Sequence, residues 1–200
     1  MTAYIAHFVK DKKLYPIIRQ HGLIQLTKQR PIHLMLIRSI LSQQLSVKVA
    51  NTLRTRFYLL FETQNPSPDE IILLPFEVLR SIGLSRTKTE YILNVADFFN
   101  REHNVPRKLS MMSNEEVIDY LTQIKGVGRW TVEMLLMFTL AREDVFPVDD
   151  YGIQTAMKRL YKLQDTNKKQ LRKSLSEIAA KWHPYETYAC MHLWRWKDEQ

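Results

Sequence analysis

The sequence predicts an all-α fold, and three observations support this. Apolar residues recur at intervals of three and four along most of the chain, which is the period of helices that bury one face. No segment shows the sustained alternation of apolar and polar residues that a half-buried strand needs. The 200 residues include only five glycines and eight prolines, which argues against a loop-rich β architecture. We therefore expect about ten helices, in one large domain or two small lobes.

The first half of the chain contains clear helix boundaries. Residues 1–30 indicate a helical segment without a strong motif, and Pro31 suits the first turn of the next helix. That pattern breaks at 43–45, and Ser46 is a good N-cap for another helix. A proline-rich loop and two short helices follow, the second closed by Gly83. Ser85 then caps a longer helix.

The second half continues in the same way. Ser113 and Glu116 form a capping box, and the helix that follows is interrupted at 126–128. A strongly apolar helix resumes over 130–140. After a connector, Asp149 or Asp150 can cap a helix that runs to about residue 161. Two further amphipathic helices are separated by Pro184.

Composition narrows the functional classes. Lys and Arg number 29 against 21 Asp and Glu, and the net charge of +8 favours a polyanionic partner such as nucleic acid; the alternative is a basic surface without a partner. The single cysteine, Cys190, excludes a disulfide framework and a four-cysteine zinc or iron–sulfur site. The chain has neither a membrane-spanning apolar run nor a signal-peptide core, so we expect an intracellular, soluble protein that is not secreted.

The first candidate site lies in residues 121–131. Gly126 and Gly128 flank an apolar residue and allow a tight turn between two helices. The amides that begin the second helix can bind an anion such as a DNA phosphate, and Lys125 and Arg129 add positive charge. A plain helix–helix turn is the alternative.

The second candidate is a pair of aspartates, Asp149 and Asp150, at the start of a helix. Capping alone explains such a pair. The two roles need not compete, because Asp149 can cap the helix while Asp150 faces a cleft.

Residues 122–131, followed by 147–153, resemble the helix-hairpin-helix superfamily of DNA glycosylases, and most closely its alkylpurine (3-methyladenine) DNA glycosylase II family. Residues 40–47 and 81–88 resemble that family specifically. The resemblance extends over about 31–196 and indicates a compact form without the N-terminal β domain of some members. It implies a single glycosylase domain over 1–200, with the hairpin at about 117–140 and the active cleft between two helical lobes.

The resemblance implies an enzyme that removes alkylated purines of the 3-methyladenine type from duplex DNA by base flipping. Asp150 corresponds to the carboxylate that stabilises charge on the sugar or deprotonates the attacking water. Bifunctional relatives carry a lysine nucleophile two residues after the second hairpin glycine, where this chain has Trp130. We therefore expect a monofunctional hydrolase without lyase activity, which leaves an abasic site. No cofactor is expected, and the absent cysteine cluster excludes an iron–sulfur centre.

By the same resemblance, Trp130 and Trp194 line the base pocket, where an aromatic face attracts a cationic base. Met134 occupies a position where some members have tyrosine. The adjacent Glu133 is either a pocket acid or an exposed helix residue, and we expect it to be exposed. Both tryptophans also suit a helical core. Gln44 corresponds to the wedge that fills the gap left by the flipped base, with Leu45 as the second candidate. A solvent-exposed polar turn is the alternative for these two residues.

The hairpin residues expected on the DNA backbone are Lys125, Gly126, Gly128, Arg129, Trp130 and Thr131. The resemblance also implies a possible Na⁺ or K⁺ ion bound by the backbone carbonyls of Thr122, Ile124 and Val127. The lysine and arginine run at 168–173 is expected to be a solvated helix face. We expect a monomer that acts on damaged duplex DNA, without a membrane partner, in the cytoplasm or nucleoid (the nucleus in a eukaryote).

Three other functions stay open. The first is a glycosylase for another base, such as oxidised guanine or hypoxanthine. The second is a catalytically silent protein that binds damaged DNA. The third, a helical module that binds DNA of any kind, would bind undamaged duplex as well as a duplex with an abasic analogue.

Overall fold

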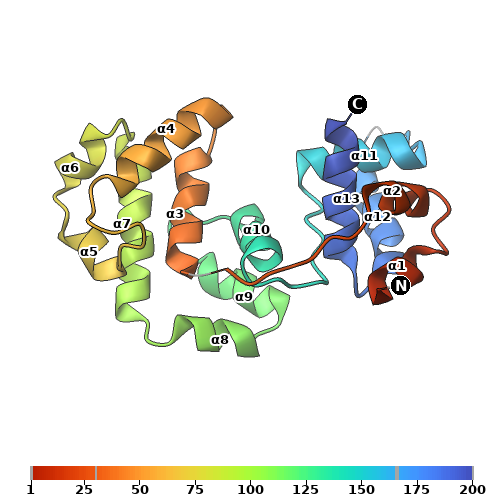
Figure 1. The fold of residues 1–200 in the computed structure, drawn as a ribbon, viewed down its shortest axis with the longest axis horizontal. Coiled ribbons are helices and arrows are strands. Elements are labelled where there is room, and N and C mark those ends of the chain that lie inside the picture. The colour runs from red at the N-terminus through yellow and green to blue at the C-terminus, as the bar shows by residue number, and fades with distance from the viewer. Residues whose placement is uncertain (1, 30, 165–166, 200) are drawn as a thin grey trace. The chain divides into compact units, whose positions relative to one another are not determined.

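The computed structural model describes residues 2–29, 31–164 and 167–199. Within these ranges the chain forms thirteen α-helices, one 3₁₀ turn and no strand, which confirms the all-α class (Figure 1). The number of helices exceeds the expected ten. The helices are α1 (Ala3–Phe8), α2 (Leu14–His21), α3 (Ile32–Ser42), α4 (Val47–Tyr58), α5 (Pro68–Leu73), α6 (Phe76–Ser81), α7 (Arg86–Arg101), α8 (Val105–Met111), α9 (Asn114–Leu121), α10 (Arg129–Phe138), α11 (Tyr151–Tyr161), α12 (Lys168–Ala179) and α13 (Glu186–Asp198), with the 3₁₀ turn η1 at Ala180–Trp182.

The chain divides into two compact units, and the boundary falls within α10. We call residues 29–135 the middle unit, and residues 1–28 together with 136–200 the terminal unit. The prediction that all 200 residues form one glycosylase domain, with its cleft between two lobes, stays a prediction.

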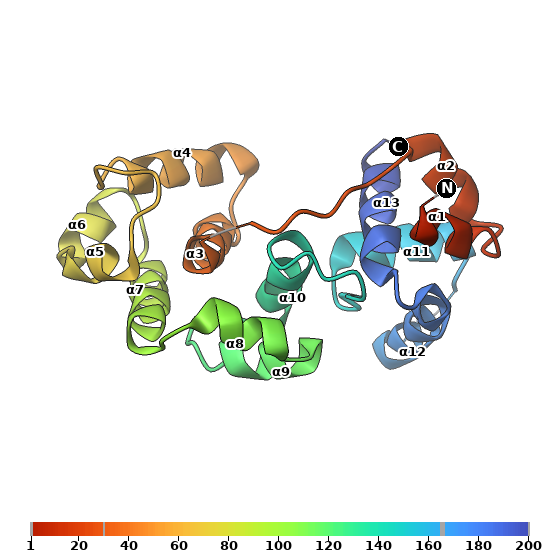
Figure 2. The same cartoon turned by 60° about the horizontal axis from the view of Figure 1, so that its bottom comes forward.

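The middle unit is built around α7, which packs against both α3 and α5. The helix α4 follows α3 after a tight turn; Figure 2 shows α3 nearly end-on and α4 lengthwise. The loop before α5 is tied to α3: Nε2 of the buried His33 on α3 lies 2.9 Å from the backbone carbonyl oxygen of Pro66. The core of this unit is mainly aliphatic and includes Leu36, Ile37, Ile40, Ile71, Leu79 and Val95, together with the buried ring of Phe57.

In the terminal unit, α13 packs against α11 and α2, so segments from both ends of the chain share one core. Tyr4 of α1 stacks on Tyr188 of α13 with ring centroids 4.2 Å apart. Residues 2–28, which carry no sequence motif, therefore form part of a folded unit.

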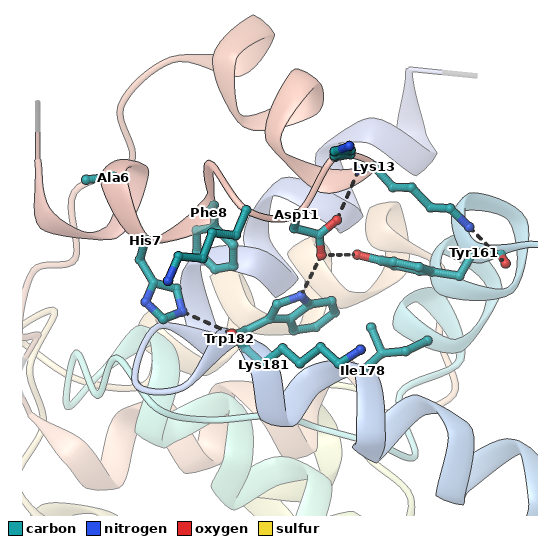
Figure 3. A pocket seen from close by; sticks show the side chains of 11 residues that line it. Ala6, His7, Phe8, Asp11, Lys13, Tyr161, Ile178, Lys181 and Trp182 are labelled. Atoms are coloured by element: carbon teal, nitrogen blue, oxygen red, sulfur yellow. Dashed lines mark hydrogen bonds between the residues drawn. The ribbon is translucent and has the colours of Figure 1, made fainter.

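Asp11 anchors the segment between α1 and α2 in a pocket of about 750 Å³ (Figure 3). Its Oδ2 accepts hydrogen bonds from the Tyr161 hydroxyl at 2.6 Å and from Trp182 Nε1 at 3.1 Å. Its Oδ1 accepts the backbone N–H groups of Lys13 and Leu14. Burial raises the pKa of Asp11, but these hydrogen bonds outweigh burial and hold the pKa below its ordinary value.

Local signals identified the starts of several helices correctly. The hydroxyls of Ser46, Ser85 and Ser113 cap α4, α7 and α9, and Glu116 completes the expected capping box. Gly83 follows α6 with φ +105°, a conformation that glycine adopts without strain. The short helix α8 was not expected; it begins after Asn104, which adopts the left-handed conformation with φ 57°.

Candidate functional site

The hairpin between α9 and α10 is held by α7 within the middle unit. Gly126 has φ +104°, and a Cβ atom there would lie 2.2 Å from Cγ of Tyr91. Only glycine permits both this backbone conformation and the close approach of the tyrosine ring. Asn94, one turn further along α7, donates from Nδ2 to the carbonyl of Lys125 at 3.1 Å. The turn is therefore packed and hydrogen-bonded against α7.

Several of the residues expected on the DNA backbone lie at the surface of this hairpin. Lys125, Gly128 and Arg129 are exposed, and Trp130 is 44% exposed. Thr131 is buried. The exposed glycine and cations leave a surface on which a phosphate can approach the amides at the start of α10.

The charge of Arg129 is shared with two carboxylates. Its guanidinium bonds both oxygens of Glu115 on α9 and, through Nε, the Oε1 of Glu133 at 3.1 Å. The hydrogen bonds with Glu115 come first among the causes that raise the pKa of Arg129 and lower that of Glu115. Arg129 thus ties the two helices of the hairpin together besides presenting charge at its surface.

The expectation that Glu133 is exposed is wrong. Only 4% of the residue is accessible to solvent, and it forms an ion pair with Arg129, which lies one helical turn earlier on α10. A buried carboxylate requires partners, and the guanidinium of Arg129 is one of them.

Asp150 is the N-cap of α11. Its Oδ1 accepts the backbone N–H of Ile153 at 2.8 Å. Of the two aspartates that the sequence offered as caps, Asp150 rather than Asp149 caps the helix. Asp149 instead bonds Arg172 of α12 through both carboxylate oxygens. Apart from this pair, the run at 168–173 forms the exposed face that was expected.

Trp194 of α13 lies against Asp150. Its Nε1 donates a hydrogen bond to Asp150 Oδ1 at 2.9 Å, and its ring lies 5.8 Å from the ring of Phe138 between centroids. Gly152 makes the approach possible, since a Cβ there would lie 3.0 Å from the indole and 3.1 Å from Asp150 Oδ1. The structure thus brings the predicted carboxylate and one predicted pocket aromatic together in the terminal unit. Phe138 and Gly152 carried no functional signal in the sequence.

The predicted wedge residues occupy the turn between α3 and α4 in the middle unit. Gln44 is exposed and adopts the left-handed conformation with φ 57°, and Leu45 is 39% exposed. Such a conformation costs a residue other than glycine about 1 kcal/mol. A turn that keeps a strained, exposed glutamine at its tip requires support from elsewhere in the unit.

Lys88, in the first turn of α7, supplies such support. Its Nζ donates to the carbonyls of Gln43 at 2.8 Å and Leu41 at 3.2 Å. Desolvation lowers the pKa of this half-buried ammonium group. Lys88 ends the segment 81–88, whose resemblance was noted but whose lysine was given no role.

The remaining predicted residues lie around the hairpin. Met134 of α10 is half-buried. The carbonyl of Ile124 accepts the N–H of Val127 at 2.9 Å, which engages one of its two lone pairs. Among residues 2–29, 31–164 and 167–199, no three side chains of His, Cys, Asp or Glu gather as metal ligands would. Every helix in these ranges is too short or too polar to span a bilayer.

Comparisons with known proteins assign this arrangement to a family. Residues 37–181 match the family described as HhH-GPD superfamily base excision DNA repair protein. The chain belongs to this superfamily. The resemblance to this superfamily is confirmed, and the two segments that carry it, 122–131 and 147–153, lie within the matched residues.

Three similar proteins carry names for the same activity. The chain is 41% identical to DNA-3-methyladenine glycosylase 1 of Schizosaccharomyces pombe over 80% of this chain and 70% of that protein. The structure of the 3-methyladenine DNA glycosylase of the same yeast in complex with abasic DNA has a TM-score of 0.84 and 32% identity, and covers 97% of this chain and 96% of its own. The crystal structure of a DNA-3-methyladenine glycosidase of Bacillus halodurans has a TM-score of 0.85 and 33% identity, and the match covers 98% of this chain and 89% of that one.

Proposed function

We propose that the protein is a monofunctional DNA glycosylase that removes alkylated purines of the 3-methyladenine type from duplex DNA. The observation that carries the proposal is the carboxylate of Asp150, bonded to the indole of Trp194 at 2.9 Å. Membership of a base excision repair superfamily and the names of the relatives support the same reaction.

The reaction breaks the bond between the base and the sugar carbon, and the base leaves with the bonding electron pair. Positive charge develops on the sugar, and Asp150 stabilises it as an anion held in a fixed orientation. The same carboxylate can instead deprotonate the water that adds to the sugar carbon. Either way an abasic site remains.

The base pocket in this proposal comprises Trp130, Met134 and Trp194. An alkylated purine is often cationic, and the face of an indole attracts a cation while it stacks on the base. Met134 is polarisable and has no hydroxyl group, so it favours shape and dispersion over a hydrogen bond to the base. This position is the one most apt to change the lesion range, and a glycosylase for another damaged base is the second candidate function.

Trp130 also supports the absence of lyase activity. Strand cleavage by a bifunctional glycosylase needs an amine that forms a Schiff base with the sugar. An indole cannot do this, so the strand stays intact after the base leaves.

DNA binding in this proposal uses the hairpin and the wedge turn. The amides at 126–131, with the charges of Lys125 and Arg129, bind one phosphate. Gln44 enters the gap left by the flipped base, and Leu45 is the second candidate. The carbonyls of Thr122, Ile124 and Val127 suit a Na⁺ or K⁺ ion, which carbonyl oxygens bind well. We expect a monomer that acts wherever genomic DNA lies, in the nucleoid or the nucleus.

The test is release of free base from methylated duplex DNA, followed by chromatography, with the strands then analysed on a denaturing gel. We expect 3-methyladenine to be released, the strands to stay intact until alkali is added, and borohydride to trap no covalent complex. Tight binding to an abasic analogue without base release would contradict the proposal and favour a silent binder or another lesion. A panel of oxidised and deaminated bases would separate these two.

A further inference from the structure

The turn between α3 and α4 has few bonds of its own. The N–H of Gln43 still bonds the end of α3, and the N–H of Leu45 bonds the carbonyl of Ser42 at a long 3.4 Å. Between them, Gln44 holds the left-handed conformation with its side chain exposed. The last carbonyls of a helix lack intrahelical partners, so those of Leu41 and Gln43 need donors from elsewhere.

Lys88 is the donor for both carbonyls, and its own position is fixed. Its backbone N–H bonds the Ser85 hydroxyl at 3.2 Å in the N-cap of α7, and α7 packs on α3. Arg56 of α4 bonds the carbonyl of Ile82 at 3.1 Å, so the segment 81–88 also holds the helix after the turn. The lysine side chain lies in a hollow of about 440 Å³ together with Leu45 and Lys48.

We propose that Lys88 is a positioning residue for the wedge: it clamps the carbonyls on the N-terminal side of Gln44 and so fixes the direction in which that side chain enters the duplex. The inference rests on the proposed function, in which Gln44 is the wedge. A clamp made before DNA binds removes the entropy that a mobile turn would lose on insertion. The ammonium group suits this role because it has three N–H donors and can bond two carbonyls at once.

Lys88 could alternatively act as a plain positive charge near DNA. Lys48 provides the matched control, because it lies in the same hollow, is exposed, and carries the same charge. Changing Lys48→Met removes one charge and leaves the bonds to Leu41 and Gln43 in place. Changing Lys88→Met removes the charge and both bonds.

The experiment measures single-turnover excision of 3-methyladenine at saturating protein for the wild type, Q44A, K88M, Q44A/K88M and K48M. Q44A and K88M should each slow excision about tenfold, and the double variant should be no slower than the slower single variant, because both changes remove one wedge function. K48M should stay within about twofold of the wild type. A double variant slowed by the product of the two effects, or a K88M rate equal to that of K48M, would overturn the inference.

A second readout does not depend on excision. Amide hydrogen exchange over residues 43–45 should accelerate by about tenfold in K88M and stay unchanged in K48M. Unchanged exchange in K88M would overturn the inference, even if the protein were inactive on every lesion. If exchange accelerates in K88M but the wild type releases no base, only the proposed function is contradicted. If K88M fails to fold, K88R, which keeps the donors, takes its place: we expect it to exceed the Q44A rate, and an equal rate would count against the clamp.

Discussion

The indole Nε1 of Trp194 and the backbone N–H of Ile153 both donate to Oδ1 of Asp150, at 2.9 and 2.8 Å. One carboxylate oxygen is thus fixed by a residue 44 positions along the chain and by the first turn of its own helix. Two donors on one oxygen define the orientation of the carboxylate plane. The candidate nucleophile-activating or charge-stabilising group is therefore oriented before any DNA binds.

Replacing Trp194 with phenylalanine keeps an aromatic ring against Asp150 and removes the N–H donor. We expect the single-turnover rate of base release to fall about tenfold, since one charge-assisted hydrogen bond to the carboxylate is lost. Trp196 is the matched control, because it packs under Arg159 on another part of the unit. A W194F rate equal to that of W196F would contradict this role.

Gly152→Ala tests the spacing between the same two side chains. The new Cβ would lie 3.0 Å from the indole and 3.1 Å from Asp150 Oδ1, so one of them must shift by a few tenths of an ångström. We expect excision to slow about tenfold, because small misplacements of catalytic groups are costly. Alanine favours helix more than glycine by about 1 kcal/mol, which offsets the cost of the close contact, so the melting temperature should change little. Loss of both stability and activity would point to a purely structural glycine.

The two hairpin glycines should respond differently to alanine. Gly126→Ala places Cβ 2.2 Å from Tyr91 and strains a φ of +104°, so we expect it to lower the free energy of unfolding by at least about 2 kcal/mol. A Cβ at Gly128 meets nothing within 4 Å, and this variant should stay stable while it binds abasic-analogue DNA more weakly. Urea denaturation and fluorescence anisotropy measure the two effects. Equal stability of both variants would refute the packing argument.

Acid stability should depend on His192. Burial, with help from His21 and Arg195, lowers the pKa of His192 to about 4, whereas histidine in the unfolded chain titrates near 6.5. Between these values the unfolded state binds more protons, so the free energy of unfolding falls as pH falls, by about 3 kcal/mol in total. Denaturation at pH 7 and 4.5 should show a larger loss for the wild type than for H192F. Equal losses would mean that other groups dominate.

Helices with a local boundary signal were predictable from the sequence. A serine hydroxyl that caps its own helix, as at Ser46, Ser85 and Ser113, needs only residues three positions away. The start of α8 was overlooked, although Pro106 lies in its first turn. Asn104, which precedes the helix, adopts a left-handed conformation without a side-chain cap. Helix starts that rest on a hydrogen bond between residues close in the sequence could thus be predicted.

Features that depend on distant partners were not. Adjacent aspartates look alike in sequence. Asp150 caps α11, whereas Asp149 binds Arg172, which lies 23 residues further along the chain. Lys88 meets its carbonyl partners 45 and 47 residues earlier. Glu133 was misjudged because an acid four residues after an arginine is as typical of an exposed helix face as of a buried ion pair.

The most direct test of the central claim is Asp150→Asn. Asparagine caps helices as well as aspartate does, and its Oδ1 can still accept from Ile153 and Trp194, so the fold should be retained. The negative charge is lost. We predict that D150N melts near the wild-type temperature and binds abasic-analogue duplex, yet releases no 3-methyladenine from methylated DNA. Release at the wild-type rate by D150N would remove Asp150 from the mechanism and contradict the account.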